Sequence, residues 1–165
     1  MFNLPLLITE DIAALDAALA DFVVASGARL ALLIDGGGFI ITRQGEAGNT
    51  DITTLGALAA NSFAATQAIA KVIEDQSVTS LYQEGSQNSL LILSISDCGF
   101  LATVFPSGIG VGSVKYYAQD TVARIGAQLT AARSRTPGEG PDLSSLNLAD
   151  TAPLFHRVAA KTFEG

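Results

Sequence analysis

The sequence predicts an α+β fold: a five-stranded antiparallel sheet sandwiched between helices. Segments whose apolar residues recur at helical spacing alternate with short apolar runs, in the order helix, two strands, helix, three strands, helix. Short turns rich in Gly, Asn and Asp join the strands inside each group, and such turns connect antiparallel neighbours. A hydrophobic share of 48% excludes a disordered chain, and 165 residues fit one domain plus a tail.

The first helix is expected over residues 10–26. Thr9 suits its N-cap, Glu10 and Asp11 favour the positive end of the helix dipole, and Gly27 suits its end. The face that carries Asp11 and Asp21 has the composition of an ordinary wet surface. Strands are expected at residues 29–35, 39–43, 79–84, 89–96 and 100–105, and the two further long helices at 51–74 and 113–133.

The domain organisation follows from composition. Residues 1–133 are expected to form the folded domain, and residues 134–148, rich in Pro, Gly and Ser, a flexible linker. Residues 149–165 are either a disordered tail or an amphipathic helix. In the second case Leu154, Phe155 and Val158 dock into a groove while Arg157 and Lys161 contact its acidic rim.

The helix expected at 51–74 gives the sharpest signal, because residues 52–70 contain no charged side chain. Its large apolar residues are expected to face the sheet; they are Ile52, Leu55, Leu58, Ile69, Val72 and Ile73. The opposite face is small and neutral, so another backbone can approach it closely. The candidate partner and dimer contacts on this face are Ala57, Ala60, Asn61, Ala64, Gln67, Ala68 and Lys71.

Two interpretations of this face remain open. One is an alanine-rich helix buried inside a single larger core, and the other is a protein-contact face, most simply that of a symmetric homodimer. Low charge favours the second: charged residues make up 15% of the chain, against about 25% in a typical soluble domain.

Charge and residue counts exclude several function classes. A net charge of -7 disfavours nucleic acid and anionic membrane surfaces as partners. One cysteine and one histidine cannot build a usual zinc site, so no metal or other cofactor is expected. No apolar run approaches the length of a membrane span, and the N-terminus is a poor signal peptide, so we expect a cytoplasmic protein.

No constellation of catalytic residues is convincing. The glycine-rich loop 108–112 precedes a helix but departs from the dinucleotide and P-loop patterns, so a flexible connection is favoured over a nucleotide site. Cys98 lies in a turn with no histidine nearby in the sequence, and His156 lies on the tail without an orienting partner. We therefore expect no catalytic residue and no enzymatic activity in the chain itself.

Residues 30–73 resemble part of a known domain family. The segment LALLIDGGGFIITRQGEAGNTDITTLGALAANSFAATQAIAKVI resembles the hairpin and long alanine-rich helix of the roadblock (dynein light chain) domain. The continuation LYQEGSQNSLLILSISDCGFLATVF keeps the resemblance to about residue 131. The helix start Asp51-x-Thr53-x-Leu55, the segment 82–85 and the terminal linker and helix point to the MglB-like bacterial members.

The resemblance implies a roadblock/profilin-like homodimer with joined sheets and adjacent second helices. MglB-like dimers place one small Ras-like GTPase across these helices, so two regulators per GTPase are implied, as are roles in motility and polarity at a cell pole. The resemblance implies that this regulator stimulates GTP hydrolysis, and exchange as well, without an arginine finger, and no arginine lies in residues 51–74. Two alternatives stay open: a non-catalytic roadblock scaffold subunit, and a small-ligand module at residues 108–112.

Overall fold

The computed structural model describes residues 4–75 and 77–135. The element order is the predicted one. Its helices and strands are α1 (Thr9–Ser26), β1 (Leu30–Asp35), β2 (Ile40–Gly45), α2 (Ile52–Val72), β3 (Ser80–Gln83), β4 (Asn88–Ile95), β5 (Gly99–Pro106) and α3 (Val111–Ser134).

The five strands form one antiparallel sheet in the order β2-β1-β5-β4-β3, with β2 and β3 at its edges. Leu32 in β1 pairs with Arg43 in β2 on one side and with Ala102 in β5 on the other. The register shifts between Leu33 and Ile34, where β2 carries an extra residue. The predicted fold class is therefore confirmed for the single chain.

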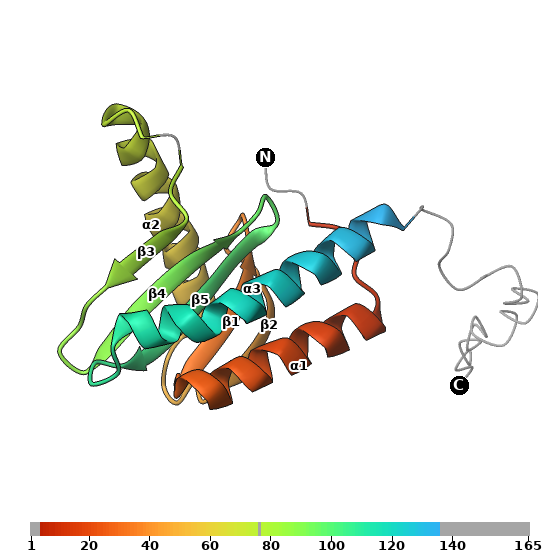
Figure 1. Ribbon diagram of the computed structural model, residues 1–165, viewed down its shortest axis with the longest axis horizontal. Helices are drawn as coiled ribbons and strands as arrows, with labels where there is room; N and C mark the ends of the chain where they lie inside the picture. Colours follow the sequence, from red (N-terminus) through yellow and green to blue (C-terminus); the bar gives the residue numbers. More distant parts are fainter. Residues whose placement is uncertain (1–3, 76, 136–165) are drawn as a thin grey trace, which may run out of the picture. The chain divides into compact units, whose positions relative to one another are not determined.

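The sheet separates two hydrophobic clusters. Successive side chains of a strand point to opposite faces, so Ala31 and Leu33 of β1 face α1 and α3, whereas Leu32 and Ile34 face α2. Figure 1 shows α1 and α3 side by side on one face and α2 on the other. Helix α2 is thus the one described helix on its side of the sheet, which matters for the site below.

The start of α1 differs from the prediction. The N-cap is Ile8 rather than Thr9, and Asp11 is buried, with 2% of its surface exposed, rather than part of a wet face. Asp11 Oδ2 accepts a hydrogen bond from the Ile8 backbone N–H at 2.8 Å, and Oδ1 accepts one from Gln128 Nε2 of α3 at 2.7 Å. The carboxylate therefore caps α1 and joins it to α3, which lies beyond what helical spacing predicts.

Substituting Asp11 with alanine tests this double role. We expect the free energy of unfolding to fall by about 2 to 3 kcal/mol, because hydrogen bonds to a charged acceptor are lost and the Gln128 amide loses its acceptor. The matched control is Glu10→Ala, which removes the exposed neighbouring carboxylate; we expect a change of at most about 0.5 kcal/mol. Urea denaturation followed by circular dichroism measures both, and equal losses would contradict the role assigned to Asp11.

Two further predictions concern membrane spans and the C-terminal region. Within residues 4–75 and 77–135, no helix is both long and apolar enough to cross a bilayer. The predicted linker and terminal helix, with Leu154, Phe155 and Val158, lie outside the described residues, so the domain boundaries at 133 and 148 and the docking of the tail stay predictions.

Candidate functional site

Helix α2 begins at a strong side-chain cap. Asp51 Oδ1 accepts hydrogen bonds from the backbone N–H groups of Thr53 and Thr54 at 3.1 Å, and Oδ2 accepts one from the Thr54 hydroxyl at 2.6 Å. The Thr54 hydroxyl and backbone N–H lower the pKa of the Asp51 carboxyl, while slight desolvation opposes them. The predicted cap is confirmed, and it fixes where the face of α2 begins.

The prediction of which α2 residues face the sheet is wrong for four of the six and holds for Ile52 and Leu55. Small side chains line it, and Phe63 is the one large anchor: its ring lies 4.7 Å, centroid to centroid, from that of Phe100 in β5. Ile52 and Leu55 do pack against this cluster. The buried residues of α2 are Gly56, Ala59, Ala60, Phe63 and Ala70. Alanines and a glycine let the helix lie close to the sheet, and that proximity excludes most of its larger aliphatic side chains.

Four large apolar residues expected on the sheet are exposed instead. The exposed fractions of Leu58, Ile69, Val72 and Ile73 are 58%, 61%, 82% and 69%. The signal that could have placed them was Phe63, the one aromatic residue of α2. Centring the helical projection on Phe63 turns Leu58, Ile69 and Val72 away from the sheet.

Most of the predicted contact residues are on the exposed side as well. Ala60 is the exception, because it is buried in the cluster below α2, and Gln67 is half-buried. The remaining predicted contacts are exposed: Ala57, Asn61, Ala64, Ala68 and Lys71. Together with Leu58, Ala65, Ile69 and Val72 they form a face in which Lys71 carries the one charge, which we call the α2 face.

The turn of the first hairpin sets the position of α2. Gly38 has φ +87°, and a Cβ added there would lie 2.8 Å from the Ala57 Cα. A Cβ added to Gly56 would lie 2.7 Å from the Gly38 carbonyl oxygen. Backbone thus meets backbone between the hairpin and α2, and only glycine permits that distance. The glycine run predicted as a turn therefore also seats the helix that carries the α2 face.

The other glycine-rich segment, residues 108–112, leads into α3. The helix begins at Val111, earlier than predicted, and Ile109 packs against the α1 and α3 cluster. The backbone N–H groups of Ser113 and Val114 donate to the Gly110 carbonyl at 3.0 and 3.4 Å. Since these first-turn donors already have an acceptor within the chain, the segment has the geometry of a strand-to-helix connection.

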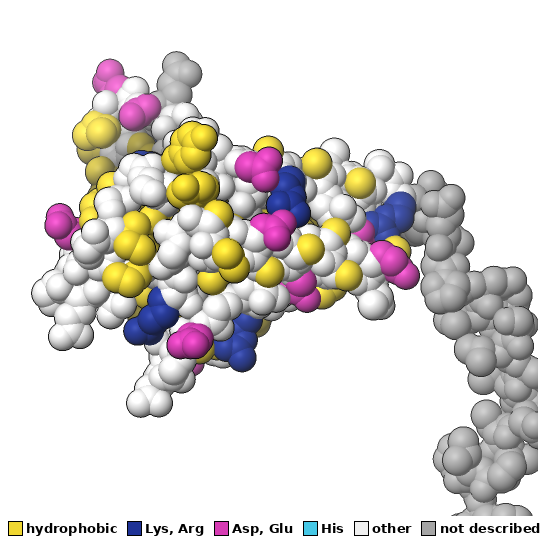
Figure 2. Space-filling model, turned by 60° about the horizontal axis from the view of Figure 1, so that its bottom comes forward, with side chains coloured by type: hydrophobic (Ala, Val, Ile, Leu, Met, Phe, Trp, Pro, Cys, Tyr) yellow, Lys and Arg dark blue, Asp and Glu magenta, His cyan; other side chains and the backbone are white. Residues whose placement is uncertain are grey.

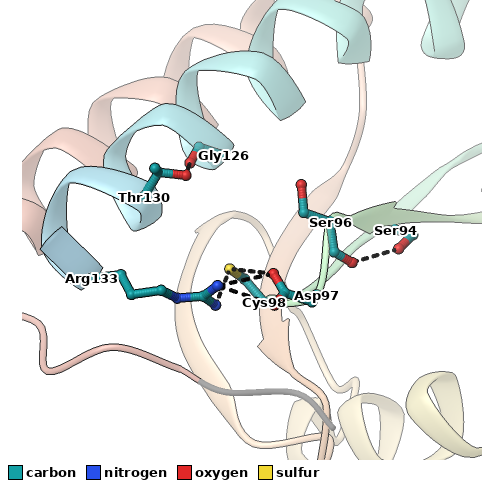
Figure 3. Close-up of polar contacts among 7 residues, drawn as sticks. All are labelled: Ser94, Ser96, Asp97, Cys98, Gly126, Thr130 and Arg133. Atoms are coloured by element: carbon teal, nitrogen blue, oxygen red, sulfur yellow. Dashed lines mark hydrogen bonds and ion pairs between the residues drawn. The ribbon is translucent and has the colours of Figure 1, made fainter.

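Cys98 belongs to a polar cluster at the turn between β4 and β5 (Figure 3). Arg133 of α3 donates to both carboxylate oxygens of Asp97, at 3.3 and 3.0 Å, and to Cys98 Sγ at 3.1 Å. Burial raises the pKa of the Cys98 thiol, and the nearby Arg133 opposes that shift. The cluster ties the end of α3 to the sheet, and a buried thiol with a raised pKa is poorly suited to nucleophilic chemistry.

Metal-ligating side chains are scattered rather than clustered. Across the described parts of the chain, no three His, Cys, Asp or Glu side chains gather in a geometry that could hold a metal ion. His156 lies outside those parts. The α2 face, with its exposed apolar and small side chains and single charge, is the candidate site, and such a surface is suited to protein contact.

Comparison with known proteins shows which family and which solved structures this chain resembles. Residues 15–105 match the family model of the Roadblock/LC7 domain. No curated protein matches the sequence. Among solved structures, MglB of Myxococcus xanthus is similar with a TM-score of 0.73 and 21% identity, over 79% of this chain and 98% of that one.

Two further MglB structures are similar to this chain. The gliding protein MglB of Thermus thermophilus has a TM-score of 0.71 and 24% identity, over 79% of this chain and 98% of that chain. MglB in a tetrameric arrangement has a TM-score of 0.71 and 25% identity, over 80% and 98%. The predicted resemblance is confirmed, and the chain belongs to the Roadblock/LC7 domain family.

Proposed function

We propose that this chain is a dimeric regulator of a small Ras-like GTPase and that it contacts its partners through the α2 face. The observation that carries the proposal is the exposure of Leu58, Ile69 and Val72 on a helix with a single charge. Full burial of one such side chain contributes about 1.5 to 3 kcal/mol, and exposed apolar patches of this kind mark protein contacts. Membership of the Roadblock/LC7 family and the similarity to MglB structures support the choice of partner.

The proposed dimer places two α2 helices side by side and joins the two sheets along an edge strand. Alanines at positions 57, 64 and 68 allow close approach of backbones, while the larger residues of the α2 face fill the space beside them. A symmetric pair of such faces forms one neutral platform, so a single GTPase is expected for two copies of this chain.

The proposed mechanism is a shift in the conformation of the GTPase. Helix α2 carries no arginine, so the α2 face supplies no guanidinium to the transferred phosphate. The platform instead binds the hydrolysis-competent arrangement of the GTPase switch loops more tightly than other arrangements, and the GTPase's own residues then act. Catalysis thus resides in the partner. The same proposal includes stimulation of nucleotide exchange on the GTPase. It also includes a role in cell polarity or motility, with the protein at a cell pole.

The decisive experiment is single-turnover GTP hydrolysis. The partner is captured from an extract of the source cells on this chain, is purified further on immobilised GTP, and is then loaded with labelled GTP. We expect hydrolysis to accelerate with increasing concentration of this protein and to saturate at two copies per GTPase. A Ras-like GTPase that binds stably and hydrolyses at its intrinsic rate would contradict regulation and favour the scaffold alternative.

A further inference from the structure

A groove of about 370 Å³, which we call the Lys115 groove, lies between α3 and the edge of the sheet, on the side opposite α2. The sheet contributes Thr79, Ser80 and Leu93 to its lining, and α3 contributes Lys115, Ala118, Gln119 and Val122. Ala118 is buried and packs with Leu93 and Val122 in the cluster beneath α1 and α3, so the floor of the groove is aliphatic. Lys115 and Val122 lie two helical turns apart on one face of α3, which gives the groove a length of about 10 Å.

Lys115, at one end of the groove, is a half-buried cation that forms no ion pair with the described residues. Its Nζ donates a hydrogen bond to the Ser80 hydroxyl oxygen at 3.1 Å, whereas Arg124 and Arg133 of the same helix each pair with a carboxylate. Lysine side chains are rarely buried unless they are paired. Figure 2 shows that basic side chains are also sparse on the side of the molecule that carries α1. An ammonium group with further donors to offer at this place therefore favours an anionic occupant.

Two hydrogen-bond donors converge at this end of the groove. Because the Ser80 oxygen accepts from Lys115, its own O–H remains available as a donor beside the ammonium group. A carboxylate, with two oxygens that only accept, matches an ammonium and a hydroxyl side by side. One ammonium balances one negative charge, and the net charge of -7 of the chain disfavours an anion that carries more. The polar end of the groove is therefore suited to a carboxylate rather than to a phosphate ester.

We propose that the Lys115 groove binds a short, free aliphatic carboxylate. The carboxylate accepts hydrogen bonds from Lys115 and Ser80, and the carbon chain lies along Ala118 and Val122, where burial of its apolar surface favours binding. The volume of the groove is near the lower end of the range for small-molecule pockets, about 300 to 1,000 Å³, which fits a ligand of this size. The α2 face lies on the other side of the sheet, so the inference does not rest on the proposed function.

Charge distinguishes the Lys115 groove from a second hollow on the same side of the sheet. That hollow, of about 310 Å³, is lined by residues of α1 and α3 that include Asp21, Asp120 and Arg124. Two carboxylates outnumber one guanidinium there, so a carboxylate ligand is repelled. No carboxylate is among the described residues that line the Lys115 groove. Of the two hollows, the Lys115 groove is therefore the one expected to bind the ligand.

Methyl NMR spectroscopy of the full-length protein, titrated with sodium hexanoate, tests the proposal. We expect the methyl signals of Leu93, Ala118 and Val122 to shift and to saturate with a dissociation constant of about 1 mM or below. Hexanol, which has the same carbon chain and no charge, should bind at least about tenfold more weakly, because hydrogen bonds to a charged group are lost. The absence of a saturable shift at these signals, or equal affinities for hexanoate and hexanol, would overturn the proposal.

Two variants locate the carboxylate. Lys115→Met removes the ammonium group and keeps an apolar stem, so we expect the affinity for hexanoate to fall about tenfold and that for hexanol to stay unchanged. The matched control, Arg43→Met, removes one positive charge at an exposed position of β2 and should leave both affinities unchanged. Equal losses in the two variants would show that net charge attracts the ligand and would overturn the assignment to this groove. Binding of acetylated alanyl-leucine without binding of hexanoate would assign the groove to a polypeptide C-terminus and contradict a free carboxylate.

Discussion

Arginines at positions 64 and 68 are expected to abolish the stimulation of GTP hydrolysis. Both alanines are exposed on the α2 face, one helical turn apart, where close approach requires small side chains. Ala64→Arg with Ala68→Arg places two charges where a partner's backbone would lie, and burial of unpaired charges is costly. We expect affinity for the GTPase to fall by at least about 100-fold, with hydrolysis at the intrinsic rate.

A matched control exists on the opposite side of the sheet. Ala123 and Ala127 of α3 have the same spacing and are also exposed, so Ala123→Arg with Ala127→Arg adds the same charge and bulk. This control should stimulate hydrolysis like the unmodified chain, and both double variants should unfold at similar urea concentrations. Light scattering adds a second readout: loss of the dimer in the α2 variant assigns this stretch to self-association. Unchanged stimulation by that variant would contradict the face assignment.

Valine at position 38 is expected to cause the largest loss of stability. Gly38 has positive φ, which costs a residue with a side chain about 1 to 2 kcal/mol, and a Cβ there would lie 2.8 Å from the Ala57 Cα. Because backbone rather than a flexible side chain blocks the Cβ, we add overpacking of about 1 to 3 kcal/mol. The expected decrease in the free energy of unfolding for Gly38→Val is thus about 2 to 5 kcal/mol, measured by urea denaturation.

Gly48 separates the two contributions. Its φ of +55° is also positive, but a Cβ added there meets no atom within 4 Å. Gly48→Val should therefore lower the free energy of unfolding by the conformational cost alone, about 1 to 2 kcal/mol. If Gly38→Val cost no more than this, the close contact between the hairpin turn and α2 would be absent in solution.

Local patterns were sufficient to predict the order of helices and strands, because turns, caps and periodicity are short-range properties. Asp51 illustrates this, since its role as cap of α2 depends only on Thr53 and Thr54. The orientation of α2 about its axis is harder to predict, because side-chain size alone indicates that Leu58 and Ile69 face the sheet. The distance between α2 and the sheet decides this orientation. The contact between Gly38 and Gly56, which are not neighbours in the sequence, sets that distance.

Asp11 is a second residue whose role depends on contacts between distant parts of the sequence. Its sequence neighbours are those of any helix with an acidic first turn, and none of them indicates that Asp11 is buried. Its second acceptor role involves Gln128, which is 117 positions away. Contacts of that separation depend on how the completed elements pack, so propensity and spacing do not reveal them.

The division of the interior by the sheet has a consequence for how such a protein can change over time. The cluster beneath α2 and the cluster beneath α1 and α3 share no side chain among the described residues. Substitutions that remodel one outer surface are therefore absorbed by their own layer and leave the other unperturbed. A lineage can therefore vary the surface on one side of the sheet while the packing on the other side is kept, and an engineer can exchange either surface on the same scaffold.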